Sequence, residues 1–417
     1  MSLQSSERSS TLEQLKAHLI ENRYSAGIQR LYLPRAERFL DYLEVNRLAI
    51  ERVGVSEFDE FLRCERRSFR KRNGVAPRNS RQWRWRYTSA VRMVLRLVRG
   101  RWPVMAAPTT ALEKFHHELT QGYDTWMSDL RGLVPVTRTK RTTQALQFLA
   151  ALGARGNSED IRQLSIRDID AYVQLRCVGL RRATIESCTG CLRNFLRYLY
   201  DSGRTALDLS GLVVGPRIYE YEHIPSALRP EEVEKVLKVT RRDRSPSGLR
   251  DYAILMLLSA YGLRAGEIVA LRLEDIDWRK EVVHVQHSKP GTHSELPLLR
   301  QAGEAMLSYL KRARPASAHR EIFLHVHAPY RPFTNGSSLN GLIGARLRAA
   351  GITPIGRKGS HAFRHARAVS LLRAAVPLKS IGDVLGHRSA HSTAVYLKLA
   401  TEDLRAVGLN VPKEVSP

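Results

Sequence analysis

Residues 360–397 read SHAFRHARAVSLLRAAVPLKSIGDVLGHRSAHSTAVYL, and the rest of the chain is interpreted around this stretch. His361 and Arg364 are three residues apart, so on a helix they share one face. His387 follows a glycine, and Tyr396 comes nine residues later in an apolar run. An imidazole, a guanidinium, a second imidazole and a phenol are the groups needed to bind a phosphate and attack it. The stretch therefore predicts a phosphate-handling site.

The composition predicts a polyanionic partner. The chain has 417 residues, and its 67 Lys and Arg against 41 Asp and Glu give a formal charge of +26. An excess of this size favours an extended polyanion, and double-stranded DNA is the partner that we expect. An arginine-rich coding style is the alternative, but it seldom leaves so large an imbalance. Hydrophobic residues make up 43%, a globular level, so two to three folded domains are expected.

No export signal or membrane span is predicted. The first ten residues are polar, and the longest apolar stretch, 252–263, has about half of the roughly 20 residues that a membrane span needs. It is therefore expected to be a buried helix. Cys188 and Cys191 have the spacing of a zinc pair, but they lack a second pair or nearby histidines, so reduced thiols are expected instead. These features predict a cytoplasmic protein with no membrane partner.

Two helical modules are predicted in the N-terminal half. The pattern of residues 53–62 recurs in 164–173, shifted by 111 residues, and Phe39 and Phe148 hold corresponding places in the segments before them. We interpret the first module as an extra domain of the same type as the second. A Gly- and Pro-punctuated linker follows. The predicted domains are 1–106 (N-terminal helical module), 107–205 (second helical module), 206–223 (linker) and 224–417 (C-terminal domain).

An arginine-rich tract lies inside the first module. Residues 63–86 hold nine Arg and one Lys against a single acid, and aromatic residues are interleaved among them. Guanidinium groups bind phosphates in pairs of hydrogen bonds, and aromatic rings pack on sugars or bases. A solvated loop and an amphipathic helix are the alternative reading. The DNA contacts expected here and on a second-module helix are Arg70, Arg72, Arg81, Arg84, Arg86, Arg181 and Arg182.

The C-terminal domain supplies further cations. Arg264 follows an apolar helix and a glycine, and Glu267 comes three residues later. Residues 276–286 alternate like a strand, a turn follows, and 294–298 returns. This pattern places Lys289 at the tip of a β-hairpin, from which a long side chain can reach into a site.

In chain order, these polar residues resemble the motifs of the catalytic domain of tyrosine recombinases, the phage integrase family. The residues that carry the resemblance are Arg264, Lys289, His361, Arg364, His387 and Tyr396, with spacing similar to that of the family. The resemblance covers 224–410. The second helical module is similar to the family's core-binding domain, and the additional N-terminal module suggests a member borne by a mobile element. The implied fold is mainly α with a small β-sheet, an α+β class.

The resemblance implies a division of labour. Arg264 and Arg364 would bind the non-bridging phosphate oxygens, and His387 would donate to one of them. Tyr396 would attack phosphorus with help from His361, and Lys289 would protonate the departing 5′-oxygen. Glu267 would support the arginines as a residue behind the site. We expect no cofactor and no metal, because no ligand cluster is found. His365 and His391 are interpreted as ordinary surface or core histidines without a role in the reaction.

The function expected is site-specific recombination through a covalent 3′-phosphotyrosine, in DNA integration, excision or transposition. The resemblance implies a homo-oligomer, a tetramer on DNA, with sister recombinases or accessory DNA-bending proteins as further partners, in the bacterial nucleoid. Two alternatives remain open. A type IB topoisomerase would use the same residues without pairing two sites, and a catalytically silent DNA-binding factor would keep only the fold.

Overall fold

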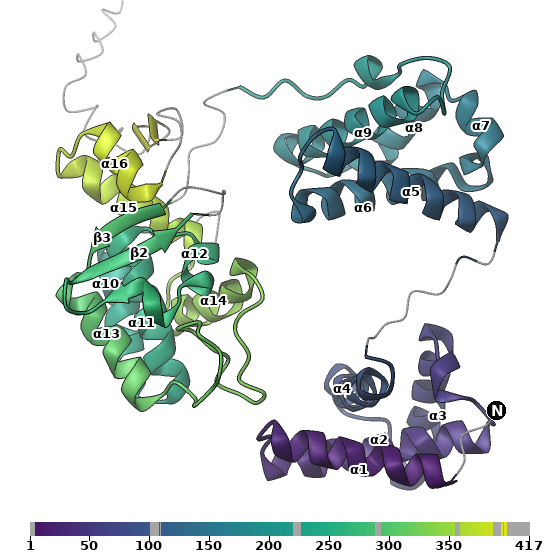
Figure 1. Cartoon of the computed structure of the whole chain (residues 1–417), viewed down its shortest axis with the longest axis horizontal. Coiled ribbons are helices and arrows are strands. Elements are labelled where there is room, and N and C mark those ends of the chain that lie inside the picture. Colours follow the sequence, from purple (N-terminus) through teal and green to yellow (C-terminus); the bar gives the residue numbers. More distant parts are fainter. Residues whose placement is uncertain are drawn as a thin grey trace, which may run out of the picture. The chain divides into compact units, whose positions relative to one another are not determined.

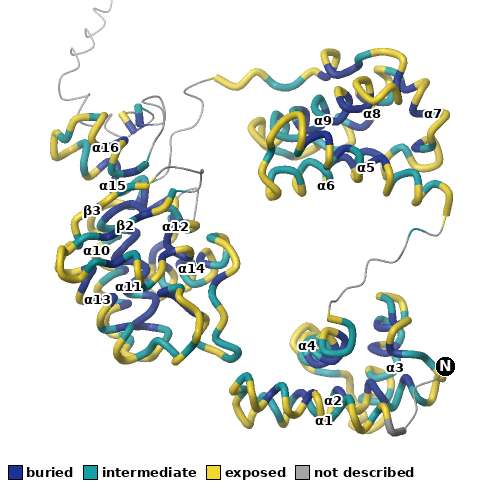
Figure 2. Tube along the Cα trace, viewed as in Figure 1, coloured by how far each residue is buried: buried dark blue, intermediate teal, exposed yellow. Residues whose placement is uncertain are grey.

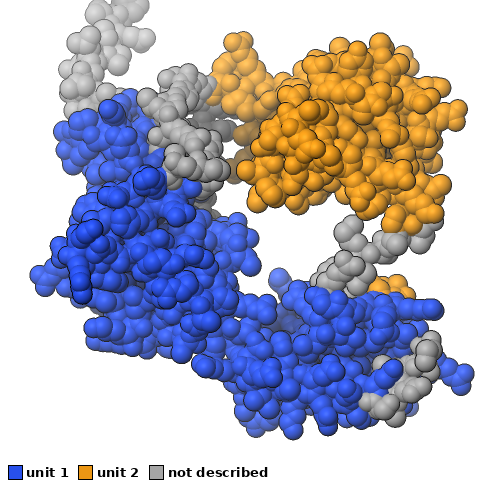
Figure 3. Space-filling model, in the orientation of Figure 1, with its two compact units in different colours: residues 1–53, 59–100, 223–417 blue, residues 54–58, 101–222 orange. Residues whose placement is uncertain are grey.

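The computed structural model describes residues 5–100, 108, 110–219, 227–287, 293–354, 359–386, 393–394 and 396–397. It is mainly helical with one small antiparallel sheet, which confirms the expected fold class. The chain divides into two compact units, residues 1–53, 59–100 and 223–417 in one and residues 54–58 and 101–222 in the other (Figure 3). No helix within the described ranges is long and apolar enough to cross a membrane.

Four helices form the described N-terminal region (Figure 1), namely α1 (Ser5–Glu21), α2 (Ala26–Val45), α3 (Val55–Asn73) and α4 (Ser80–Arg99). The last helix begins where the Asn79 side chain accepts a hydrogen bond from the backbone N–H of Gln82, 2.9 Å away. Phe39 on α2 is fully buried, and its ring meets that of Phe61 on α3 edge-on at 5.1 Å. Apolar spacing at helical period therefore produces one aromatic core here.

The following helices are α5 (Ala111–Asp129), α6 (Pro135–Leu152), α7 (Ser158–Arg162), α8 (Ile166–Cys177) and α9 (Arg182–Asp201). A capping box between Thr110 and Glu113 opens α5. Phe148 on α6 is fully buried and meets Tyr172 on α8 edge-on at 5.0 Å. Tyr172 lies 111 residues after Phe61, the same offset as the sequence repeat. The recurring ring pair supports the predicted duplication, which stays a prediction.

The C-terminal region contains α10 (Pro230–Arg242), α11 (Pro246–Tyr261), α12 (Ala265–Ala270), β1 (Ile276–Asp277), β2 (Val282–Gln286), β3 (His293–Pro297), α13 (Arg300–Arg312), α14 (Leu339–Ala349), α15 (Ser360–Arg373) and α16 (Leu378–Leu385). Helix α11 is buried along most of its length (Figure 2) and packs against α10, α13 and α15. This confirms the buried helix expected at 252–263. The packing around α11 therefore fixes the position of its C-terminal end, at Tyr261.

The sheet has the order β1-β2-β3 and is antiparallel throughout. Val283 and Val285 of β2 are buried, and Val283 pairs with Leu296 of β3, which is also buried. The alternation expected from the sequence is therefore present, with one face of the hairpin on the core. Residues 288–292, which contain Lys289, lie outside the described residues.

Candidate active site

Arg264 is placed by the end of α11. The helix stops at Gly262, whose left-handed φ of +65° suits glycine, and a Cβ there would lie 2.7 Å from the side chain of Leu385. Two residues later Arg264 caps the start of α12, where its backbone N–H donates to Glu267 Oε2 at 2.7 Å. Its guanidinium donates to Glu267 Oε1 at 2.8 Å and to the carbonyl of Gly386 at 3.1 Å. The predicted support of Arg264 by Glu267 is thus a direct, two-point contact.

Glu267 has a third partner that the sequence did not indicate. Its side chain is almost fully buried, and its Oε1 atom also lies 2.8 Å from His287 Nδ1. The other ring nitrogen of His287 lies 2.8 Å from the hydroxyl of Ser294 on β3. A buried carboxylate is stable only when its oxygens are satisfied, and here three N–H groups satisfy them. Arg264, Glu267, His287 and Ser294 therefore form one continuous polar chain.

Arg364 lies on α15 and is buried. Its Nη1 donates to the carbonyl of Gly262 at 2.8 Å, and its Nη2 donates to the carbonyl of Leu385. Burial and the neighbouring charge of Arg264 lower the pKa of the Arg364 guanidinium, which still keeps its charge. The two arginines therefore hold consecutive carbonyls, those of Leu385 and Gly386, at the end of α16. His387 follows directly in the sequence but lies outside the described residues.

Tyr396 is 3% exposed and packs with Leu385 and Ile381. Its phenol oxygen lies 3.2 Å from Nδ1 of His365 on α15 and also hydrogen-bonds Arg364. Burial raises the pKa of the Tyr396 phenol, and the hydrogen bond and charge of Arg364 oppose the rise. The structure thus brings the predicted nucleophile beside one of the two predicted phosphate-binding arginines.

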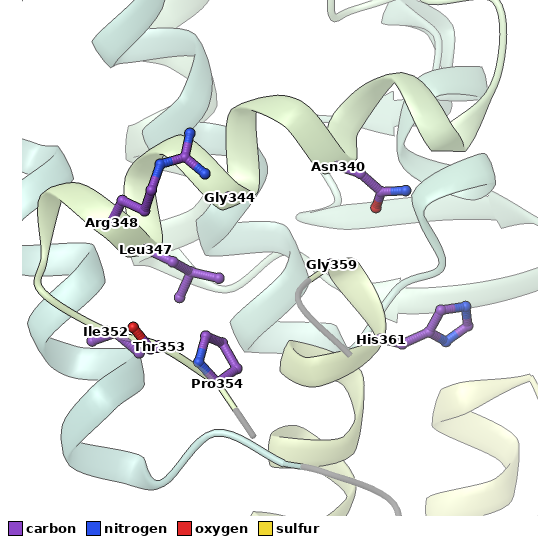
Figure 4. A pocket seen from close by; sticks show the side chains of 9 residues that line it. All are labelled: Asn340, Gly344, Leu347, Arg348, Ile352, Thr353, Pro354, Gly359 and His361. Atoms are coloured by element: carbon purple, nitrogen blue, oxygen red, sulfur yellow. The ribbon is translucent and has the colours of Figure 1, made fainter. Parts of the chain in front are cut away.

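His361 is exposed at the start of α15, one helical turn before His365, with the two ring centres 6.2 Å apart. It lines an open pocket of about 570 Å³ between α14 and α15 (Figure 4). The pocket is lined by Asn340, Gly344, Leu347, Arg348, Ile352, Thr353, Pro354, Gly359 and His361. His361, the predicted helper, therefore lines the pocket, whereas His365, for which no role was expected, contacts the tyrosine.

The arginines expected to contact DNA lie on two separate regions. Arg70 on α3 is exposed and lines a hollow with Arg63, Arg66 and Arg67. Of the others, Arg72 and Arg84 are exposed but pair with Glu65 and Asp59, at 3.6 and 2.7 Å. Arg81, Arg86, Arg181 and Arg182 are exposed or half-buried, and the guanidinium of Arg182 stacks over Tyr219 at 5.6 Å.

Three contacting residues escaped the sequence interpretation, namely His287, Ser294 and His365. The signal for the first two was weak, because a histidine and a serine at the ends of paired strands are common in any hairpin. His365 directly follows Arg364, and its helical position one turn after His361 was the available clue. Within the described residues, no group of three or more His, Cys, Asp or Glu side chains could hold a metal ion.

Comparisons with known proteins find a matching protein family and several similar sequences. The family model described as the phage integrase family matches residues 226–403. A Sinorhizobium fredii (strain NBRC 101917 / NGR234) protein, y4gC, named as an integrase/recombinase, is 54% identical over 45% of this chain and 97% of its own length. The tyrosine recombinase XerC of Pelotomaculum thermopropionicum (strain DSM 13744 / JCM 10971 / SI) is 30% identical over 64% of this chain and 90% of its own.

Among solved structures, a lambda integrase tetramer bound to a Holliday junction matches with a TM-score of 0.52 and 17% identity. The match covers 77% of this chain and 87% of that one, and at this identity it shows a shared fold. The two close relatives, each of which is covered over nine tenths or more of its length, settle the family. The chain belongs to the phage integrase family of tyrosine recombinases.

Proposed function

We propose that this chain is a site-specific DNA recombinase that cleaves and rejoins double-stranded DNA through a covalent 3′-phosphotyrosine on Tyr396. One observation carries the proposal. The Tyr396 phenol hydrogen-bonds the guanidinium of Arg364, and the charge of Arg264 also acts on it. This supports one shared site for the proposed nucleophile and the two proposed phosphate-binding cations. Residues 132 positions apart in the sequence (264 to 396) are brought together there by α11, α15 and the end of α16.

The proposed step starts with a phosphodiester held by Arg264 and Arg364. Each guanidinium can give two parallel hydrogen bonds to phosphate oxygens, and both offset the charge that builds up at phosphorus. The Tyr396 oxygen forms a bond to phosphorus while the bond from phosphorus to the 5′-oxygen breaks. Lys289 gives its proton to that leaving oxygen, and rejoining reverses these events. The bond energy is kept in the phosphotyrosine, so no nucleotide hydrolysis is needed.

The phenol must lose its proton during attack. Burial raises the pKa of Tyr396 above its usual value of about 10, so the side chain is a neutral phenol at neutral pH. His365 Nδ1, 3.2 Å from the phenol oxygen, is placed to accept that proton. His361 retains a role at the phosphate, because its exposed ring at the pocket edge can meet an incoming DNA strand.

DNA is held in part by the N-terminal helices. Arg63, Arg66, Arg67 and Arg70 line one hollow on α3 together with a single acid, Glu60. Exposed guanidiniums in such a row neutralise successive phosphates and give binding without reading the sequence. We propose that this surface and Arg181 and Arg182 contact the DNA backbone.

The active form on DNA is proposed to be a homo-oligomer. The lambda integrase structure that shares this fold is a tetramer bound to a Holliday junction, and strand exchange between two duplexes requires four cleavages, one for each strand. Sister recombinases and DNA-bending proteins are further proposed partners. The reactions proposed are integration, excision or transposition, and the relative y4gC bears the name integrase/recombinase.

The test is recombination in a plasmid that carries two copies of the native element's end. Wild type is expected to produce recombined circles, and the Tyr396→Phe variant is expected to produce none. Relaxed plasmid without recombined circles would contradict site-specific recombination and support a topoisomerase. Binding without any strand cleavage would support a silent DNA-binding factor.

A further inference from the structure

His287 occupies an unusual position directly after β2. Its side chain is 8% exposed, and both of its ring nitrogens are engaged. Nδ1 lies 2.8 Å from Glu267 Oε1 on α12, and Nε2 lies 2.8 Å from Ser294 Oγ on β3. A histidine at a strand end is usually exposed on one side. This ring instead bridges a helix start and the returning strand of the hairpin.

The chemistry of Glu267 fixes one hydrogen on this ring. The Glu267 carboxylate can only accept, so Nδ1 of His287 carries a hydrogen and donates it. The Ser294 hydroxyl can donate or accept, so it satisfies Nε2 and every polar atom of the bridge has a partner. A fully satisfied buried network holds its members in one geometry. The imidazole therefore holds Glu267 and Ser294 in a fixed relative position.

Gly386, the residue that ends α16, packs directly against the His287 ring. Gly386 has a left-handed φ of +61°, and a Cβ built on it would lie 2.4 Å from the His287 ring. The carbonyl of Gly386 accepts from Arg264, whose guanidinium also pairs with Glu267. The ring therefore fits into a space that exists only because residue 386 is a glycine.

We propose that His287 is a positioning residue for the strand-cleavage reaction, which holds the Arg264–Glu267 pair against strand β3 of the hairpin. The inference rests on the proposed function. His287 directly follows β2, and Ser294 lies on β3 opposite Val285, so their contact joins the two described strands near the end of β2. Glu267 ties the same ring to Arg264. One buried imidazole thus sets the position of the proposed phosphate-binding arginine relative to the strands of the hairpin.

A matched control lies on the same strand. His284 is 42% exposed and pairs across the hairpin with Glu295, 3.5 Å away. It is the same residue type, three positions earlier, but it has no described contact with Glu267 or Arg264. Replacing it removes an imidazole from the same hairpin without touching the bridge.

The experiment measures single-turnover formation of the protein–DNA adduct on a nicked duplex at saturating DNA. Wild type, His284→Ala, His287→Ala, His287→Asn and Ser294→Ala are compared at a temperature at which circular dichroism shows each to be folded. His287→Ala is expected to be slower by about 10- to 100-fold, because small misplacements of catalytic groups cost this much. The DNA concentration for half-saturation should stay within about threefold of wild type, because the arginine surface on α3 is unchanged.

Rescue by the conservative variant separates positioning from mere folding. The side-chain amide of His287→Asn places an N–H near the position of Nδ1, so it should recover most of the rate lost in His287→Ala. Ser294→Ala should lose less than His287→Ala, because the His287 ring keeps its contact with Glu267 when the Ser294 hydroxyl is removed.

The possible outcomes are distinct. Equal adduct rates for His287→Ala and His284→Ala, with wild type active, would refute the positioning role and leave the proposed function standing. A loss explained entirely by weaker DNA binding, or shared in full by His287→Asn, would refute it as well. No adduct from wild type would overturn the proposed function and this inference together.

Discussion

Replacing Glu267 by glutamine tests the buried network at its centre. The Glu267 side chain is 1% exposed and accepts from the Arg264 backbone and guanidinium and from His287, at 2.7 to 2.8 Å. Glutamine keeps one acceptor oxygen but turns the other into an N–H₂ group that must face a donor. The negative charge opposite Arg264 is lost too. Removing one partner of a fully buried pair costs about 3–5 kcal/mol.

The exposed fraction of Arg264, 31%, lowers this figure, because water screens the remaining charge. We therefore expect Glu267→Gln to reduce the free energy of unfolding by about 2–4 kcal/mol. The full-length protein is unfolded in urea, and pulsed hydrogen exchange in peptides from α11 and β2 follows this region alone. The control is Glu304→Gln, whose i,i+4 pair with Arg300 has side chains 61% and 90% exposed.

Glu304→Gln should leave the free energy of unfolding essentially unchanged, because water screens this exposed pair. Equal costs for the two variants would refute the view that Glu267 is a buried hub. An increase in stability in Glu267→Gln would refute this view more strongly, because it would mean that the Arg264 and His287 N–H groups do not need the carboxylate as their acceptor.

Three further predictions follow from the described contacts. Gly386→Ala should lower the free energy of unfolding by more than about 1 kcal/mol and slow adduct formation, because Gly386 has a left-handed φ and a Cβ there would lie 2.4 Å from the His287 ring. The control is Gly341→Ala on α14, where a Cβ meets no atom within 4 Å, and thermal unfolding should show it to be neutral or slightly stabilising. His365→Leu should slow adduct formation at least tenfold at unchanged DNA affinity, and an unchanged rate would remove this residue from the reaction. Replacing Arg66 and Arg70 by alanine should reduce the slope of log affinity against log salt by about 0.9 per lost phosphate contact, and an unaltered slope in a binding titration would contradict contact there.

Local patterns in the sequence were sufficient for the architecture. Helical spacing of apolar residues, the alternation of 276–286 and the glycine after α11 each specify a local structure, and these structures are present. The order of the polar residues was enough to nominate Arg264, Glu267, Arg364 and Tyr396, which the fold brings together. The predicted roles of Lys289 and His387 concern positions outside the described residues and stay predictions.

The missed residues depend on packing between distant segments. His287 meets Glu267 across 20 residues, and His365 meets Tyr396 across 31, so no local pattern could reveal either contact. His365 also has an ordinary alternative, since a histidine on a half-buried helix face is usually structural. Only the position of Tyr396 against α15 shows which of the two histidines on that helix approaches the phenol.

The central claim is that Tyr396 is the nucleophile, and it is tested most directly by trapping the covalent intermediate. A nicked duplex from the native element's end loses a short fragment on cleavage, so rejoining is blocked and the adduct accumulates. Wild type and Tyr396→Phe, which differ by one oxygen atom, are compared on a denaturing gel. An adduct from wild type alone, mapped by peptide mass to Tyr396, is the predicted result. An adduct of equal yield from Tyr396→Phe, or one attached elsewhere in wild type, would contradict the account.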